Sequence, residues 1–321
     1  MDILTTFFSV PLTGFGAGMA LAALTTLVFA YIWCAKKCVV YGVWIRLCVL
    51  ALPLMLLGSR VLYAIGNILY YTRTAGNVWL MLNFWEGGAS VLGALLGLIL
   101  AAVLTERWTH AKPGVLLDAV GFGFLPGVCV ERLFEKGTEL GMGQTIDGGW
   151  MAEHSFFAVD DGYGYVVNAV FHYEAVVAAV LFVVLAAWML IRKGNPGFSG
   201  DLLLGGLTLF GACQALLESL RNDGHMLIGF VRVNQIVAIV LPVAALTVWT
   251  IRAHKGVKGF DWKLLVCWIL AAGGIAVATV QEFAVDSSDN VLLDYGIMAS
   301  ALALVAFAAF AARNLVLKRK A

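Results

Sequence analysis

The chain contains few charged residues. They make up 13% of its 321 residues, whereas hydrophobic residues make up 61%. A typical soluble domain has about 25% charged residues. The 21 Lys and Arg nearly balance the 20 Asp and Glu, and no basic tract with interleaved aromatic residues occurs. A nucleic-acid partner is therefore not predicted.

Signals for metal and cofactor sites are also missing. The six cysteines lack the paired CxxC spacing of a zinc site, and we interpret them as small hydrophobic residues in packed helices. There is no Walker motif, dinucleotide fingerprint or internal repeat, so no metal site and no cofactor is predicted. The start, Met1-Asp2-Ile3, lacks a basic region, and no removed signal peptide is predicted.

Long apolar runs take up most of the chain. Each has about 20 residues, which is enough to cross about 30 Å of hydrocarbon. Since backbone polar groups must be satisfied internally in lipid and these runs are too long for barrel strands, helices are predicted. The fold class is therefore an all-α, polytopic membrane protein with about nine spans. The predicted spans are 10–34, 42–66, 79–104, 114–131, 164–191, 201–220, 228–251, 264–281 and 291–312.

The distribution of lysine and arginine predicts the orientation. Loops on one side, with the C-terminal tail, hold most of the basic residues, and the opposite loops hold few basic but many acidic residues. The basic side contains Lys36, Lys37, Arg107, Lys112, Arg192, Lys193, Arg252, Lys255, Lys258, Lys263, Arg313, Lys318, Arg319 and Lys320. Because basic loops stay in the cytoplasm, the N-terminus is predicted outside and the C-terminus in the cytoplasm.

Charged side chains also occur inside or at the ends of the predicted spans. Each costs roughly 2.5–3.5 kcal/mol at a helix centre, so each needs a reason. On the predicted topology, charged and polar residues from six helices fall in the outer half of the membrane. These residues are Arg60, Glu86, Arg132, Glu174, Glu218, Arg221, Arg232 and Gln235. Asp118, near the inner end of its span, is predicted to be structural.

Two interpretations of this outer group remain open. The residues could be structural ion pairs between helices, or arginines that reach the interface. Alternatively, several arginines at headgroup depth suit the phosphate of an anionic lipid, which guanidinium groups bind in bidentate geometry. Gly87, Gly88 and Gly93 would leave room there for acyl chains or for close backbone approach.

The same residues resemble motifs of the bacterial prolipoprotein diacylglyceryl transferases. Gly58-Ser59-Arg60-Val61-Leu62-Tyr63 is similar to that family's Gly-Ala-Arg-Leu-Gly-Tyr, and Trp85-Glu86-Gly87-Gly88-Ala89-Ser90 to its Trp-x-Gly-Gly-Met-Ser. Asp118 and Arg132 match its Asp and the Arg of Gly-Arg-Ile-Gly-Asn-Phe, and Tyr173-Glu174 falls at its Leu-Tyr-Glu. The stretch Gly211 to Arg221, with Glu218, resembles Tyr-Gly-x-x-Arg-x-x-x-Glu-x-x-Arg, and Asn234-Gln235 replaces Gly-Gln. The resemblance covers about residues 10–250.

Several family positions differ in this chain. The family's His falls on Leu92, its Tyr on the first helix falls on Thr13, and the Gly-Asn after the signature Arg is missing. On the sixth span Phe210 and Gln214 replace a Tyr and an Arg. The last two spans lie beyond the usual seven.

The resemblance implies transfer of a diacylglyceryl group from a phosphatidylglycerol-like phospholipid to the lipobox cysteine of a prolipoprotein signal peptide. Arg132 and Arg221 would then hold the phosphate, with Arg60 and Arg232 in support. Glu174 or Glu218 would position the arginines or act as the base, and His172 and His154 are substitute candidates for the base. The remaining lipid-binding candidates are Tyr63, Trp85, Gly87, Gly88, Tyr173, Gln214 and Gln235.

The predicted organisation has two parts in a bacterial plasma membrane. Residues 1–251 form a seven-helix, transferase-like body with an outward-facing loop, 132–163. Residues 252–321 add a cytoplasmic linker, two further spans and a basic tail. A relative that binds or moves an anionic phospholipid without turnover is the alternative function. A transporter built from inverted repeats is not supported, because no such repeat occurs.

Overall fold

The structure is a computed structural model of residues 1–321. It describes residues 3–7, 10–83, 88–138, 140–224, 226–228, 231–255, 261–285 and 288–320.

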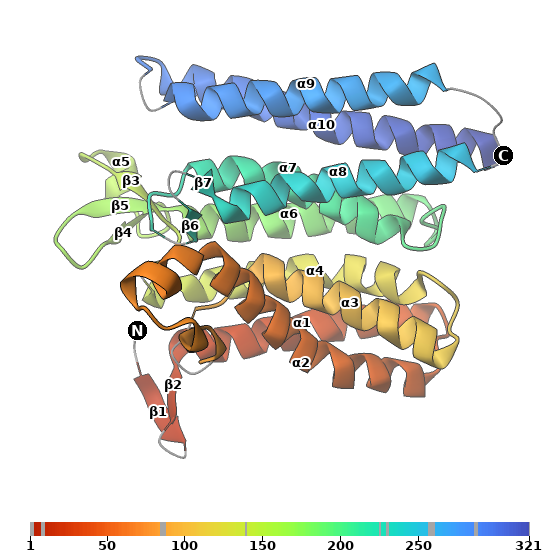
Figure 1. The fold of residues 1–321 in the computed structure, drawn as a ribbon, viewed down its shortest axis with the longest axis horizontal. Coiled ribbons are helices and arrows are strands. Elements are labelled where there is room, and N and C mark those ends of the chain that lie inside the picture. Colours follow the sequence, from red (N-terminus) through yellow and green to blue (C-terminus); the bar gives the residue numbers. More distant parts are fainter. Residues whose placement is uncertain are drawn as a thin grey trace. The chain divides into compact units, whose positions relative to one another are not determined.

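Long helices dominate the chain, as predicted (Figure 1). They are α1 (Gly14–Lys36), α2 (Tyr41–Gly66), α3 (Val91–Thr109), α4 (Val115–Phe134), α6 (Val170–Ile191), α7 (Asp201–Ser219), α8 (Val233–His254), α9 (Trp262–Val285) and α10 (Val291–Lys320). Among the described residues, eight of these helices are long and apolar enough to cross a membrane, and α4 is not among the eight. The chain is therefore a polytopic helical membrane protein.

Short elements lie between the helices. Strands were not expected, yet the described residues form a hairpin of β1 (Ile3–Phe7) with β2 (Val10–Thr13), a sheet in the order β3-β5-β4 and a hairpin of β6 (Leu227–Ile228) with β7 (Val231–Arg232). The sheet contains β3 (Met142–Thr145), β4 (Ala158–Asp160) and β5 (Val166–Ala169), with α5 (Trp150–Glu153) between β3 and β4. It folds the predicted 132–163 loop back onto the start of α6. The 3-10 helices η2 (Val78–Leu82) and η4 (Glu135–Gly137) and the π-helix η1 (Tyr70–Thr74) complete the connections.

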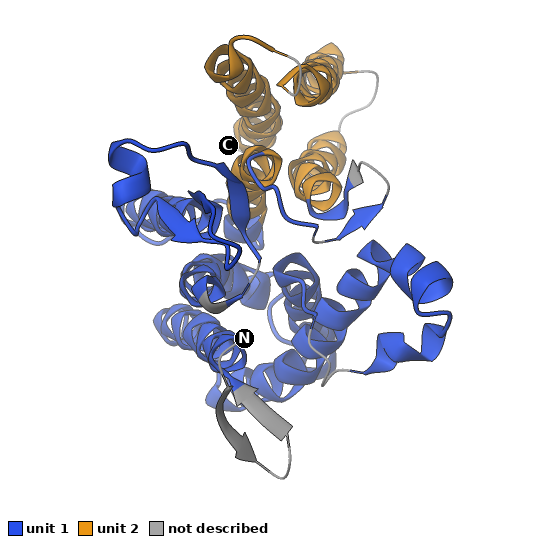
Figure 2. Cartoon of the chain, turned by 90° about the vertical axis from the view of Figure 1, so that its left-hand side faces the viewer, with its two compact units in different colours: residues 1–203, 220–234 blue, residues 204–219, 235–321 orange. Residues whose placement is uncertain are grey.

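The chain divides into two compact units, coloured separately in Figure 2. Unit 1 contains residues 1–203 and 220–234, and unit 2 contains residues 204–219 and 235–321. Unit 1 therefore holds α1 to α6 and the small sheets, and unit 2 holds most of α7 and α8 with α9 and α10.

Close helix contacts in unit 1 depend on glycine. A Cβ at Gly97 on α3 would lie 2.0 Å from the carbonyl oxygen of Leu54 on α2, and one at Gly93 would lie 2.3 Å from that of Gly58. Gly93 thus provides the close backbone approach that was one of its two predicted roles. In unit 2, a Cβ at Gly274 on α9 would lie 2.6 Å from the carbonyl oxygen of Ala301 on α10. Small residues let membrane helices pack at short distance in this way.

Carboxylates hold the starts of two helices, α4 and α7, in unit 1. Glu106 accepts hydrogen bonds from the backbone N–H of Gly114 at 2.8 Å and of Leu116 at 2.7 Å, at the start of α4. Asp118 accepts from Gly200 and Leu202, both at 2.9 Å, at the start of α7. Side-chain acceptors satisfy N–H groups that a helix start leaves unpaired. The structural role predicted for Asp118 is confirmed.

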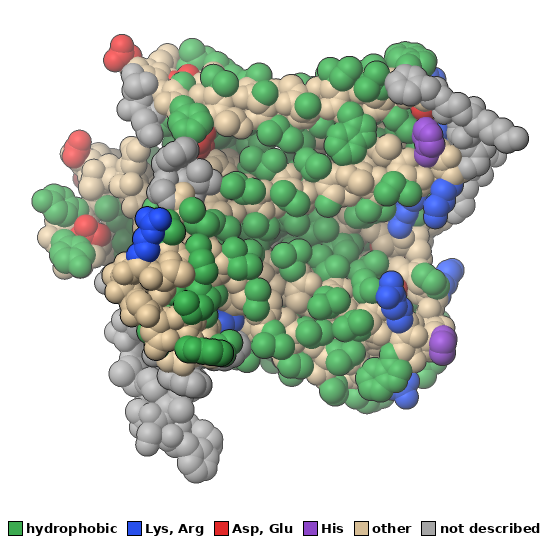
Figure 3. All heavy atoms as spheres, in the orientation of Figure 1, with side chains coloured by type: hydrophobic (Ala, Val, Ile, Leu, Met, Phe, Trp, Pro, Cys, Tyr) green, Lys and Arg blue, Asp and Glu red, His purple; other side chains and the backbone are tan. Residues whose placement is uncertain are grey.

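The flanks of the helices are apolar. Val49, Val183 and Phe307 are each 63% exposed, and hydrophobic side chains cover the visible flanks in Figure 3, with most of the charged groups near helix ends. Large exposed apolar areas are unusual in soluble monomers. They are expected where lipid tails contact a helix.

Candidate active site

Glu174 lies at the centre of a buried charge network in unit 1. It sits in the second turn of α6, and its side chain is 0% exposed. Its Oε2 atom lies 2.9 Å from Nε of Arg132 and 3.4 Å from Nη1 of Arg221. Arg132 ends α4 and Arg221 follows α7, so three segments that are distant in sequence meet at one carboxylate oxygen. These three residues were predicted to lie together.

The network continues along the segment after α7. Nη2 of Arg221 lies 2.9 Å from Oδ2 of Asp223, which also accepts a hydrogen bond from Gly141 N–H at 2.7 Å. Arg232 donates from Nη2 to the Arg221 carbonyl at 2.5 Å, and its Nη1 lies 3.5 Å from Oδ1 of Asp223. A β-bridge between Gly143 and Arg221 ties this segment to the sheet. Arg232 therefore contacts Arg221, and its predicted support of a bound phosphate stays a prediction.

Two further acids flank Arg132 and were not predicted as site residues. Oε1 of Glu135 lies 2.5 Å from Nη1 of Arg132, and Oε2 of Glu131 lies 3.5 Å from its Nε. Both acids are 3% exposed. Burial raises the pKa of Glu135, which follows the end of α4, and the charge of Arg132 only partly opposes this. The position of Glu135, three residues after an arginine at the end of a span, could have indicated its contact with Arg132. Adjacent residues do not face each other on a helix, so the position of Glu131 carried no such signal.

A narrow pocket lies beside this network, and we call it the arginine pocket. It is lined by Phe15, Ala89, Ser90, Val91, Leu92, Glu131, Arg132, Glu135, Leu140, Arg221 and Asn234. Both Arg132 and Arg221 line it, so the two residues border a common space. That these two arginines bind a phosphate stays a prediction.

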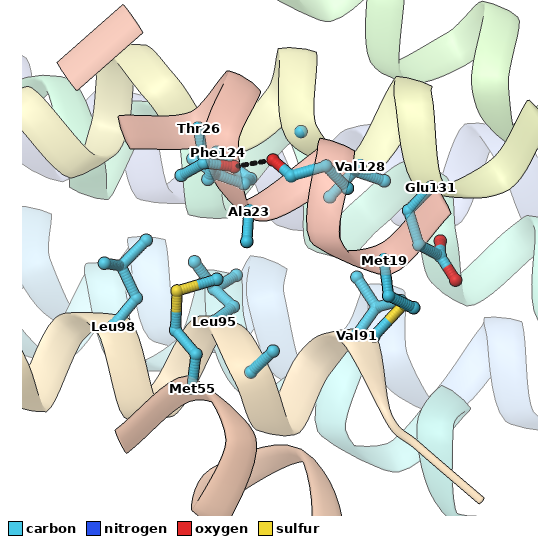
Figure 4. Close-up of a pocket in the computed structure, with 13 residues that line it drawn as sticks. Met19, Ala23, Thr26, Met55, Val91, Leu95, Leu98, Phe124, Val128 and Glu131 are labelled. Atoms are coloured by element: carbon cyan, nitrogen blue, oxygen red, sulfur yellow. Dashed lines mark hydrogen bonds between the residues drawn. The ribbon is translucent and has the colours of Figure 1, made fainter. Parts of the chain in front are cut away.

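A second pocket, which we call the apolar pocket, lies among α1, α2, α3 and α4 (Figure 4). It is lined by Met19, Ala22, Ala23, Thr26, Met55, Val91, Ala94, Leu95, Leu98, Phe124, Gly127, Val128 and Glu131. Apart from the Thr26 hydroxyl, which donates to the Ala22 carbonyl at 3.0 Å, and Glu131, its walls are hydrocarbon or sulfur. Such a lining suits an aliphatic chain.

Arg60 belongs to a different group of contacts. Its guanidinium donates to the carbonyl oxygens of Leu80, Met81 and Gly88 at 3.0, 2.8 and 3.2 Å. The guanidinium also lies 5.5 Å from the ring centre of Tyr63. Gly88 has a φ of +84°, and a Cβ there would lie 2.3 Å from the Tyr63 ring. The contacts of Arg60, Tyr63 and Gly88 therefore hold the segment that leads into α3. Trp85, Glu86 and Gly87 lie outside the described residues.

The candidate histidines contact the loop that precedes α6. Nδ1 of His172 lies 2.8 Å from the Phe156 carbonyl and its ring stacks on Phe156. Nδ1 of His154 lies 2.6 Å from the Trp150 carbonyl. The hydroxyl of Tyr173 is 3.3 Å from Oδ1 of Asn168. Among the described residues, none of these three lines the arginine pocket.

The remaining candidates belong to unit 2. Nε2 of Gln214 donates to Oε1 of Glu218 at 3.1 Å within α7. Nε2 of Gln235 donates to Oε2 of Glu282 at 2.8 Å and to the Ala215 carbonyl at 3.2 Å. Gln235 thus connects α8 with α9, one of the two helices beyond the usual seven. The roles predicted for these residues stay predictions.

Comparison with known proteins identifies the family. The family model "prolipoprotein diacylglyceryl transferase" matches residues 2–251. The phosphatidylglycerol–prolipoprotein diacylglyceryl transferase of Limosilactobacillus reuteri is 24% identical over 215 residues, 65% of this chain and 76% of that protein. The enzyme of the same name from Clostridioides difficile is 26% identical over 198 residues, 61% of this chain and 73% of that protein. That of Listeria monocytogenes is 23% identical over 251 residues, 77% and 88% of the two chains. The chain belongs to the prolipoprotein diacylglyceryl transferase family.

Proposed function

We propose that this protein is a phosphatidylglycerol–prolipoprotein diacylglyceryl transferase, which moves diacylglyceryl from an anionic phospholipid to a cysteine thiol. The observation that carries the proposal is the position of Arg132 and Arg221, which share Glu174 and line one pocket. The apolar pocket, which shares Val91 and Glu131 with the arginine pocket, offers space for an acyl chain.

The proposed reaction displaces a phosphate from a glyceryl carbon. Negative charge builds up on the departing glycerol phosphate, and donors that are already in place stabilise it without reorganisation. Glu174 holds Arg132 and Arg221 in place for this task, since each guanidinium is anchored to the same oxygen. Arg232 supports Arg221 by donating a hydrogen bond to the backbone carbonyl of Arg221.

The charge balance of the network adds one requirement. Within unit 1, the carboxylates of Glu131, Glu135, Glu174 and Asp223 lie within 3.5 Å of the guanidinium groups of Arg132, Arg221 and Arg232. These acids already engage the arginines on several sides. An incoming phosphate therefore has to replace one of these carboxylates as the acceptor of the arginine N–H groups. Glu135, which contacts Arg132, is the candidate, because η4 lies outside the long helices.

The finer topology is also part of the proposal. We place the N-terminus outside the plasma membrane of a bacterium and the C-terminus in the cytoplasm, because of the lysine and arginine distribution. We take α4 as a ninth span, because it packs between apolar helices and its charges lie at its two ends, Asp118 and Glu131-Arg132. Residues 1–251 form the catalytic body, and 252–321 form an added two-helix part.

Product release tests the proposal directly. Purified protein with phosphatidylglycerol and a peptide that carries a lipobox cysteine is expected to release glycerol phosphate. Arg132→Ala should abolish this release, whereas Arg73→Ala, which removes an exposed arginine of η1, should leave it unchanged.

Two outcomes would count against the proposal. If the wild-type protein retains phosphatidylglycerol in native mass spectrometry but releases nothing, the binding-only alternative replaces it. If Arg132→Ala is as active as the wild-type protein, the phosphate site has been placed wrongly.

A further inference from the structure

The two pockets of unit 1 meet at a carboxylate. Glu131 lines both the apolar pocket and the arginine pocket, and among the described residues only Val91 shares this position. Figure 4 places Glu131 at the end of the apolar pocket where Met19 and Val91 lie, with Leu98 toward the other end. A lipid with its tail in the apolar pocket and its phosphate on the arginines would have its glyceryl carbons beside Glu131.

Glu131 is also the most weakly held acid of the network. Its Oε2 atom makes no hydrogen bond with any described part of the chain, and its ion pair with Nε of Arg132 spans 3.5 Å. Glu174 and Asp223 lie 2.9 Å from their arginines, and Glu135 lies 2.5 Å from Arg132. Although Oε2 of Glu135 also has no hydrogen bond to a described residue, Glu135 does not line the apolar pocket.

The other candidates for a base are occupied elsewhere. Glu174 is paired with both arginines, Glu218 accepts a hydrogen bond from Gln214, and His172 and His154 contact loop carbonyls. The charged groups that face Glu131 are Arg132 on α4, Glu135 on η4, Glu174 on α6 and Arg221 after α7. The described residues of α1, α2 and α3 that line the two pockets are uncharged.

We propose that Glu131 is a catalytic residue that accepts the proton of the acceptor thiol. The proposal rests on the proposed transferase function. As the carbon–sulfur bond forms, the thiol proton passes to the Glu131 carboxylate, and the carbon–oxygen bond to phosphate breaks. Glycerol phosphate leaves with the electron pair of that bond, and the proton of Glu131 then passes to water. Because the thiolate is the nucleophile, loss of this acceptor slows the reaction.

The test compares two acceptor peptides. Glu131→Gln should release glycerol phosphate about 10²- to 10⁴-fold more slowly with a cysteine peptide, while it still binds phosphatidylglycerol in native mass spectrometry. A peptide with selenocysteine in place of cysteine should restore much of the rate, because its selenol is ionised at neutral pH and needs no base. Glu153→Gln, which removes an exposed carboxyl of α5, should behave like the wild-type protein with both peptides.

Several results would overturn the assignment. Wild-type activity of Glu131→Gln, a rate that selenocysteine does not restore, or loss of lipid binding would each exclude a proton-acceptor role. If Glu131→Gln does not fold, Glu131→Asp carries the test, and its cysteine-to-selenocysteine rate ratio should be lower than that of the wild-type protein. An unchanged ratio rejects the role. Inactivity of the wild-type protein with both peptides would instead reject the transferase function itself.

Discussion

Nε of Arg132 lies 2.9 Å from Oε2 of Glu174, although the two residues belong to different helices. The pair is almost fully buried, with side-chain exposures of 6% and 0%. A buried ion pair fixes its arginine firmly, but removal of one partner leaves an unpaired charge. In the proposed function, this relationship gives Glu174 the role of a positioning residue.

Neutralising Glu174 should therefore affect both arginines. We expect Glu174→Gln to lower the free energy of unfolding by roughly 3–5 kcal/mol and to reduce glycerol phosphate release by at least about 100-fold. Thermal unfolding in detergent and the release assay would measure these effects. Glu153→Gln, an exposed change of the same type, serves as the matched control. A variant with normal turnover would show that the arginines keep their positions without Glu174.

Arg221 makes its contacts with three nitrogens. Nη1 faces Glu174, and Nε and Nη2 donate to Asp223 at 3.1 and 2.9 Å. Lysine has one nitrogen and cannot form this fork. We expect Arg221→Lys to keep part of the affinity for phosphatidylglycerol but to lower kcat by about tenfold or more. Arg73→Lys is the control. Equal kcat values for wild type and Arg221→Lys would mean that charge alone is sufficient.

Asp118 offers a contrasting case, because it acts on the fold rather than on the site. The side-chain amide of asparagine has one oxygen where Asp118 has two. It can therefore accept a good hydrogen bond from only one of the backbone N–H groups of Gly200 and Leu202. We therefore expect Asp118→Asn to lower the free energy of unfolding by roughly 1–3 kcal/mol. Release of glycerol phosphate per folded molecule should stay unchanged. Asp147→Asn, at an exposed position, should alter neither quantity, and a loss of specific activity in Asp118→Asn would place Asp118 in the catalytic machinery.

The pH dependence of stability should report on the start of α9. Burial acts to raise the pKa of Asp261, but hydrogen bonds from Arg319 and from Lys263 N–H, with the charge of Arg319, lower it overall. An acid whose pKa is lower in the folded state stabilises the fold above its unfolded pKa, and this contribution is lost as the pH falls through the folded pKa. The midpoint temperature of thermal unfolding of the wild-type protein should therefore decrease as the pH is lowered below about 5.

Two variants separate Asp261 from other acids. In Asp261→Asn the decrease of the midpoint at low pH should be smaller, whereas Asp289→Asn, an exposed change, should show the wild-type decrease. If both variants follow the wild-type curve, the contact between Asp261 and Arg319 does not contribute to stability in solution.

Much of the candidate site could be inferred from sequence because charges in apolar spans are expensive. Arg132, Glu174 and Arg221 stood out for this reason, and they do meet. Glu131, Glu135 and Asp223 were missed as site residues because each lies beside an arginine at the end of a span, where a solvated acid costs little. The separate role of Arg60 was missed because its partners are backbone carbonyls, which no sequence pattern marks.

The sequence alone determined that the chain is a bundle of membrane helices, because about 20 apolar residues are needed to cross a bilayer whatever their tertiary contacts. Only the tertiary structure decided which acid holds which arginine and that Glu131 stands where two pockets meet. The reason is that these contacts depend on the rotation of each helix about its axis and on the path of the loops between them. A turn of one residue moves a side chain by about 100° around a helix, and hydropathy does not specify that angle.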